Sequence, residues 1–261
     1  MQNVSQEYRD IVAGNHWFEN RLCIGDTGKL IDKSGSAITF GGVRILVDSG
    51  GAETGYGEEL LISMEQKQPL LSDSPDVGKT CAGEINVEMI HPYGDIPKRA
   101  LLRPYIRAAN ENAASEWLPQ GKYYIDKRSE GEIGDRTKLT LHGYDGMLLL
   151  EEDYPAESSL NWPAKDIEVL KEISDAVGIS LDSRVYQIVT SGYEIPYPAG
   201  YSCREVIGYI GAMYTGSWAM TATGELMLVT LTGLPKETNY LIVGGSDNRA
   251  ITFGGVRILV R

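Results

Sequence analysis

The chain has 261 residues, of which 42% are hydrophobic and 23% are charged, and its formal net charge is −12. This length and apolar share indicate a globular chain of about two domains, which excludes a disordered protein and makes stabilising disulfides or metals unnecessary. The acidic balance excludes a basic nucleic-acid-binding stripe. The sequence has no signal-peptide pattern and no apolar run long enough for a membrane helix, so we expect a protein made in the cytoplasm, without membrane insertion.

The first predicted element is a short helix from Val4 to Val12, because apolar residues recur there at helical spacing. Asn3 or Ser5 is suited to cap its start, and Gly14 to end it. From residue 15 to residue 155 the chain consists of short apolar or alternating runs separated by glycine and aspartate, which is typical of strands and tight turns. We therefore expect one compact antiparallel β unit, a sandwich or a barrel.

Alternation within these runs predicts which side chains face the core. Tyr123 and Ile125 share one face of KYYIDKR, and Leu139 and Leu141 share one face of TKLTL. The segment RALLRPYIRAA contains Pro104, which favours an extended conformation over a helix.

The next block, residues 157–232, predicts a small α+β module of two helices and a β-hairpin. Its first helix is expected to open at Asn161 to Pro163, with Pro163 near the first helical position, and to end at Gly178. Apolar residues at helical spacing give this helix a buried stripe, which consists of Ile167, Leu170, Ile173 and Val177.

The second helix of the module is expected to begin at Ser202, where Glu205 would complete a capping box. Its predicted buried side consists of Val206, Ile207, Ile210, Met213 and Tyr214, and Gly216 follows as a stop. The stretch SWAMTATGELMLVTL then predicts a strand, a tight turn near Thr223-Gly224 and a second strand.

An eleven-residue stretch, AITFGGVRILV, occurs twice without a difference, at residues 37–47 and 250–260. Its apolar residues change parity at the Gly-Gly pair, so a straight strand would point them to both faces. A hairpin with Gly41-Gly42 as its turn pairs Phe40 with Val43 and places all of them on one face, whereas a bulge would reset the phase of one longer strand. We favour the hairpin; either form is structural.

The residues that could carry chemistry do not form a recognisable constellation. The stretch DVGKTC at residues 76–81 resembles the end of a phosphate-binding loop. Such a loop needs a glycine five positions before Gly78, where this chain has Asp73, so an ordinary turn before a strand is favoured. No motif links His16, His91 and His142, and the acidic pairs Glu58-Glu59 and Glu151-Glu152 are expected to be solvated. Two further ideas, phosphate binding by Lys98, Arg99, Arg103 and Arg107 and calcium binding by residues 48–59, are disfavoured.

The cysteines likewise give no sign of a chemical site. The three cysteines, Cys23, Cys81 and Cys203, are widely spaced without a CxxC pattern, which predicts buried free thiols rather than disulfides or a zinc site. We therefore expect no catalytic residue, no cofactor-binding residue and no metal ligand, and a role in assembly or binding.

The order of several segments resembles the hub proteins of tailed-phage tail tips and baseplates, which are minor structural or tail-associated proteins of siphophages and prophages. The resemblance spans roughly Tyr8 to Leu231. It is carried by LLSDSPDVGKTCAGEINVEM, GDIPKRALLRPYIRAA, SEWLPQGKYYIDKRSEGE and KLTLHGYDGMLLLEEDY, followed by LNWPAKDIEVLKEISDAVGI and CREVIGYIGAMYTGSWAMTATGELMLV.

This resemblance implies a homotrimer that closes the end of a hexameric tail tube, with two related tube-type β domains in each subunit. Its implied partners are a distal tail or tail-tube protein, the tape-measure protein and a spike or receptor-binding protein, with DNA only as passing cargo. The implied location is the tail tip of the virion, assembled in the bacterial host cytoplasm.

The resulting prediction is an α+β fold, mainly β, in three parts. Residues 1–156 form a tube-type β domain, residues 157–232 the small α+β module, and residues 233–261 a linker and the start of a second tube-type β domain. The predicted function is that of a non-enzymatic, ring-forming hub. The alternatives are the scaffold part of a tail-associated cell-wall hydrolase and the hub of a contractile injection system.

Overall fold

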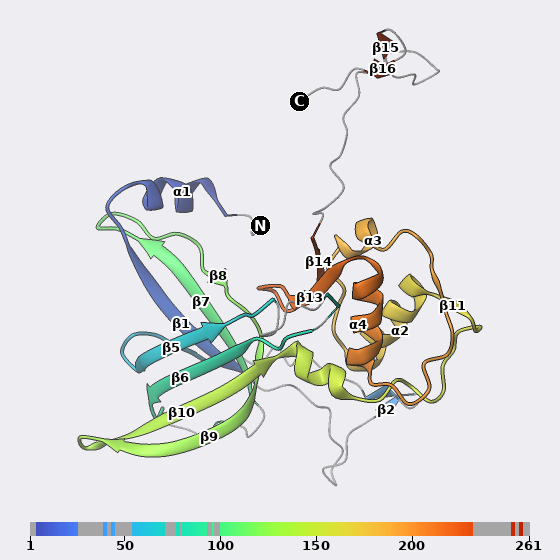
Figure 1. Cartoon of the computed structure of the whole chain (residues 1–261). Coiled ribbons are helices and arrows are strands. Elements are labelled where there is room, and N and C mark those ends of the chain that lie inside the picture. Colours follow the sequence, from blue (N-terminus) through green and yellow to red (C-terminus); the bar gives the residue numbers. More distant parts are fainter. Residues whose placement is uncertain are drawn as a thin grey trace.

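The fold was examined in a computed structural model, which describes residues 4–25, 39–40, 43–44, 54–70, 77–78, 80–92, 96, 100–231, 252–253 and 256–257 (Figure 1). Most of the described chain forms one large antiparallel sheet and, beside it, a smaller helical body. The predicted class, α+β and mainly β, is confirmed.

The large sheet has eight strands in the order β4-β1-β7-β9-β10-β6-β5, with β8 paired to β7. Among the described residues the sheet is open, with β4 and β5 at its two edges, so the expected barrel is not closed. The strands are β1 (Trp17–Gly25), β4 (Thr54–Tyr56), β5 (Leu61–Lys67), β6 (Glu84–Ile90), β7 (Leu101–Ala109), β8 (Leu118–Pro119), β9 (Tyr123–Ile133) and β10 (Arg136–Asp145).

Alternation decides which face of this sheet is buried, as predicted. Tyr123 and Leu139 have no exposed surface, and the intervening polar residues of β10 remain partly exposed. The segment around Pro104 is extended in β7 and pairs with β1 along its whole length, which confirms the strand prediction. The sheet core consists of Leu22, Ile24, Ile85, Val87, Met89, Ile96, Ala100, Leu102, Tyr123, Ile125, Leu139 and Leu141.

The amino-terminal helix, α1 (Gln6–Ala13), forms as expected. The Ser5 hydroxyl accepts a hydrogen bond from the Tyr8 amide, and Gly14 follows the helix at its other end. The carboxylate of Glu116 fixes this start to the sheet unit, because it accepts bonds from both the amide and the hydroxyl of Ser5.

The helical body contains three helices and two small antiparallel strand pairs. The helices are α2 (Asp166–Val177), α3 (Val185–Ile188) and α4 (Cys203–Met213); the pairs are β11 (Ala164–Lys165) with β12 (Glu194–Ile195) and β13 (Gly216–Met220) with β14 (Leu226–Thr230). A 3-10 helix, η1 (Gly146–Glu151), links the sheet to this body. Trp218 is fully buried at its centre, and its indole N–H donates to the Ile207 carbonyl.

Two details of this body confirm the sequence analysis. Ser202 and Glu205 form the capping box at the start of α4, and the β13–β14 hairpin turns at Gly224, where φ is +81°. Gly178 ends α2 in the left-handed conformation.

The predicted start of α2 is wrong. The sequence placed it at Asn161 to Pro163, but Ala164 and Lys165 are extended because they pair with Ile195 and Glu194. The helix therefore begins at Asp166, and Pro163 precedes a strand rather than opening the helix. The buried stripe is shifted too, since Ile167 is only partly buried whereas Val169 has no exposed surface. At the other end of the body, Met213 was expected on the buried side of α4 but is 41% exposed.

Both copies of the repeated stretch adopt the predicted hairpin pairing. In the first, β2 (Thr39–Phe40) pairs antiparallel with β3 (Val43–Arg44), with Phe40 opposite Val43. In the second, β15 (Thr252–Phe253) pairs in the same way with β16 (Val256–Arg257). The Gly-Gly turns lie outside the described residues, as do the linker at residues 233–239 and most of the rest of the third predicted part.

Candidate functional site

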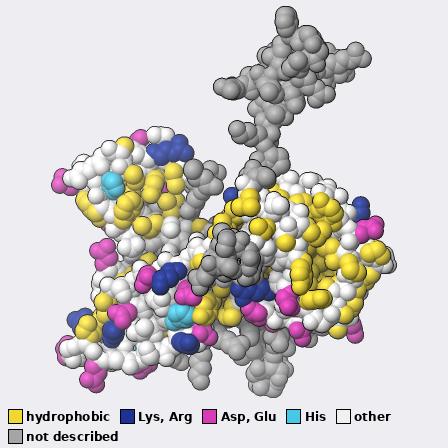
Figure 2. All heavy atoms as spheres, viewed as in Figure 1, with side chains coloured by type: hydrophobic (Ala, Val, Ile, Leu, Met, Phe, Trp, Pro, Cys, Tyr) yellow, Lys and Arg dark blue, Asp and Glu magenta, His cyan; other side chains and the backbone are white. Residues whose placement is uncertain are grey.

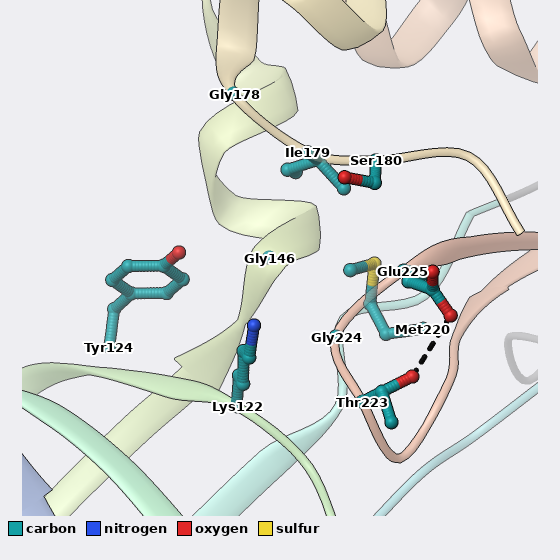
Figure 3. Close-up of a pocket in the computed structure, with 10 residues that line it drawn as sticks. All are labelled: Lys122, Tyr124, Gly146, Gly178, Ile179, Ser180, Met220, Thr223, Gly224 and Glu225. Carbon is teal, nitrogen blue, oxygen red and sulfur yellow. Dashed lines mark hydrogen bonds between the residues drawn. The ribbon is translucent and has the colours of Figure 1, made fainter. Parts of the chain in front are cut away.

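A cavity lies where the sheet unit meets the helical body (Figure 3). It encloses about 310 Å³. Lys122 and Tyr124 line it from the start of β9, Gly146 from η1, and the remaining residues from the turn after α2 and the β13–β14 hairpin. These other lining residues are Gly178, Ile179, Ser180, Met220, Thr223, Gly224 and Glu225.

The polar groups of this cavity do not form a nucleophile with an adjacent base. The Glu225 carboxylate accepts a hydrogen bond from the Thr223 hydroxyl at 3.0 Å, which belongs to the hairpin turn itself. Burial raises the pKa of Tyr124, so its hydroxyl stays protonated at neutral pH. The cavity is therefore a gap between two packed units, and its lining residues do not form a catalytic arrangement.

The described residues of the Gly-Lys-Thr stretch, Gly78 and Thr80, pack against the helical body. Thr80 forms a parallel bridge with Trp218, and its side chain accepts a hydrogen bond from Arg204 at 2.7 Å. The amide of Gly78 donates to the Gly216 carbonyl. These contacts attach the segment before β6 to α4 and β13. Residues 77–78 form a turn before the strand, as the sequence favoured.

The three histidines lie on separate elements. The ring of His16, which precedes β1, meets that of Phe18 edge to face, and His91 follows β6 and contacts Arg128. The third, His142, lies in β10 between two carboxylates, with Glu84 and Asp126 each at 3.9 Å. The pairing of β10 with β6 and β9 brings His142, Glu84 and Asp126 together, although they are far apart in sequence.

Two of the candidate charged residues, Arg107 and Glu151, form ion pairs within the chain. Arg107 forms an ion pair with Glu19 at 2.6 Å and lies 4.5 Å from the centre of the Trp117 ring, so it is not free to bind phosphate. Lys98 and Arg99 lie outside the described residues, as does most of the disfavoured calcium segment. Of the acidic pair, Glu151 forms an ion pair with Arg204, and Glu152 is exposed.

All three cysteines are free thiols, with Cys23 and Cys203 buried and Cys81 half-buried. Within the described ranges, no group of three or more His, Cys, Asp or Glu side chains is arranged to hold a metal ion. In the same ranges, no helix combines the length and the apolar character that a membrane crossing requires.

The feature that sequence reasoning missed is a set of exposed aromatic side chains on the helical body. Figure 2 shows hydrophobic side chains gathered on this body. Tyr193, Tyr197 and Tyr201 are between 37% and 44% exposed, and Tyr209 of α4 is 60% exposed. The signal in the sequence was tyrosine at every fourth position of a segment in which Pro196 and Pro198 disfavour a helix.

No family model matches the sequence, and no curated protein matches it. Among solved structures, the 43 kDa tail protein of prophage MuSo2 from Shewanella oneidensis is similar, with a TM-score of 0.50 and 12% identity over 83% of this chain and 56% of that chain. This chain shares its fold with a prophage tail protein.

Two further solved structures are similar at lower scores. They are the tail protein from Neisseria meningitidis MC58 (TM-score 0.44, 12% identity, 84% of this chain and 53% of that chain) and the prophage tail protein gp18 from Listeria monocytogenes EGD-e (0.43, 8%, 87% and 56%). The chain thus spans little more than half the length of each of the three proteins. At these identities the likeness concerns the fold alone.

Proposed function

We propose that this chain is a structural component of a phage tail, namely the ring-forming hub at the tail tip that closes the tail tube and connects it to the spike or receptor-binding apparatus. The observation that carries the proposal is the fold shared with the MuSo2 tail protein over 83% of this chain. The ordered sequence segments point to the same class of protein. The role is one of symmetric assembly rather than catalysis.

The open sheet supports an assembly role. Among the described strands, β5 pairs with β6 alone, so one of its sides is an edge with unpaired backbone groups. Such edges pair readily with another chain. Ile62 on β5 is 43% exposed, which places an apolar side chain at this edge. We infer that β5 lies at the interface between neighbouring subunits of the ring, and that the partners are further tail components.

The experiment is light scattering coupled to size-exclusion chromatography on the full chain. The expected result is a trimer of 28.6 kDa subunits that Ile62→Lys converts to monomer. Ile133→Lys is the matched control, because Ile133 is 45% exposed at the tip of the β9–β10 hairpin, away from the β5 edge. A chain that stays monomeric at all concentrations contradicts the ring, and lysis of bacterial cell walls by the purified chain contradicts the non-enzymatic role.

A further inference from the structure

Four exposed, largely apolar side chains of the helical body, Tyr197, Tyr201, Tyr209 and Met213, make up what we call the tyrosine face. Tyr209 and Met213 are one turn apart on α4, so they lie on the same side of the helix. The ring of Tyr201 meets that of Tyr209 edge to face, with centroids 5.7 Å apart. The four side chains are between 37% and 60% exposed.

Hydrogen bonds order the Tyr197 and Tyr201 part of the tyrosine face. The Tyr197 hydroxyl donates to the carbonyls of Pro155 and Ala156, both at 3.1 Å, and its ring contacts Trp162. The capping box fixes the turn into α4 directly after Tyr201. A ligand that covers these rings therefore loses little affinity to side-chain ordering, which is why rigid tyrosines are common at interfaces.

A strip of carboxylates borders this face, because the segment from Glu151 to Glu157 runs beside residues 201–203. Asp153 bridges to Ser202, and the Cys203 amide donates to the Glu152 carbonyl. Glu151 is paired with Arg204, whereas the exposed side chains of Glu152, Asp153 and Glu157 form no ion pair within the described part of the chain. We call these three residues the acidic rim.

The acidic rim acts on the neighbouring helix start. Burial raises the pKa of the Cys203 thiol to about 11, and the negative charges of Glu152 and Asp153 contribute to that rise.

We propose that the tyrosine face and the acidic rim together bind an extended segment rich in arginine and lysine from another protein. Aromatic rings attract such cations over their faces, and carboxylates pair with them at the edge. The chain already uses this contact internally, since the Lys171 amine lies 5.6 Å from the centre of the Tyr186 ring. This surface goes beyond the proposed hub function and does not depend on it.

Charge argues against a second copy of this chain as the occupant. The chain carries 36 acidic and 24 basic residues, so a second copy brings few free cations to this acidic rim. Several basic side chains that the structure describes are already engaged in ion pairs, namely Arg107, Arg128, Lys138, Arg184 and Arg204. A cationic segment of a different protein fits the surface better.

The test uses the full chain and a fluorescent hexaarginine peptide, with binding followed by anisotropy at several salt concentrations. The variants are Tyr201→Ser with Tyr209→Ser, and Glu152→Gln with Asp153→Asn and Glu157→Gln. Each set should weaken binding by about five- to tenfold, and Tyr201→Phe with Tyr209→Phe should retain it, because the rings remain. The wild-type affinity should fall as salt rises.

The matched control removes the same number of charges elsewhere, by Glu111→Gln, Glu132→Gln and Asp135→Asn at exposed positions. It should change hexaarginine binding by less than about twofold, because it leaves the local field of the face intact. The proposal is overturned if this control weakens binding as much as the rim variant, or if the serine variant binds as tightly as the wild type. Light scattering on the same samples separates this result from the ring, since peptide binding is expected whether or not the chain is trimeric.

Discussion

Among single residues, Asp145 shows how a buried charge makes stability depend on pH. Its side chain is 4% exposed and accepts hydrogen bonds from the amides of Met147 and Gly83, at 3.0 and 2.8 Å. Burial raises the pKa of this carboxyl to about 6, and the two amide bonds oppose that rise only in part. Between pH 3.8 and about 6 the native state therefore holds a proton that the unfolded chain has lost.

It follows that the free energy of unfolding should decrease as pH rises through this window, by about 3 kcal/mol in total, since each pKa unit corresponds to about 1.4 kcal/mol. Asp145→Asn removes the titration, so urea unfolding at pH 4.5, 5.5 and 6.5 should show a flatter dependence for this variant than for the wild type.

Asp182→Asn is the matched control. The hydrogen bond from Arg184 lowers the pKa of Asp182, so its contribution to stability is present above pH 3.8 and is lost only as pH falls below that value. The difference between wild type and this variant should therefore stay constant across the same three pH values. Equal slopes for the wild type and Asp145→Asn would show that Asp145 does not titrate in this range.

Residue-scale prediction from sequence succeeded where the partners are local. The caps at Ser5, Ser202 and Gly178 depend on residues within a few positions, so spacing alone reveals them. Asp145 bonds to Gly83 across 62 positions, and His142 meets Glu84 and Asp126 only through strand pairing. No local pattern encodes such contacts.

At the scale of elements, the packing of α4 depends on a close backbone approach at Gly78. Its φ is +86°, and a Cβ atom there would lie 2.5 Å from the Gly208 carbonyl oxygen and 2.7 Å from the Cβ of Ala212. Gly78→Ala should therefore lower the free energy of unfolding by more than about 2 kcal/mol, because strained backbone and a steric clash add together. Chemical denaturation measures this loss.

Gly134→Ala is the control for backbone strain alone. Gly134 also has a positive φ, +62°, but a Cβ atom there would meet nothing within 4 Å. This substitution should cost about 1 kcal/mol. If both alanine variants lose the same stability, the contact between Gly78 and α4 contributes nothing of its own.

The elements that sequence reasoning misplaced are those that tertiary pairing determines. Pro163 is compatible with the first turn of a helix. However, Ala164 and Lys165 pair with β12 as a strand, so the helix begins only at Asp166. The stretch from Gly146 to Glu151 continues the apolar texture of β10, but Asp145 caps it as a 3-10 helix. In the first case a long-range pairing outweighed local propensity. In the second, a local cap at Asp145 ended the strand.

For the whole molecule, the described residues bury two separate apolar clusters. One lies against the large sheet, and the other fills the helical body. The second cluster includes Met147, Leu150 and Tyr154, which precede residue 157, where the sequence analysis placed the start of the α+β module. The division at residues 156 and 232 remains a prediction, and its test must ask which residues unfold together.

Because the clusters share no residue, a cavity in one should destabilise mainly that one. Leu150→Ala should cost about 2–5 kcal/mol and should speed hydrogen exchange in α2 and α4 while leaving the amides of β6 and β10 protected. Val87→Ala should have the opposite pattern, since Val87 is fully buried in the sheet cluster. Exchange that rises throughout the chain in either variant would show one cooperative unit, with the segment from Gly78 to Gly83 coupling the two clusters. Local exchange in both variants would instead place Met147 and Leu150 in the helical body, so that this body begins before residue 157.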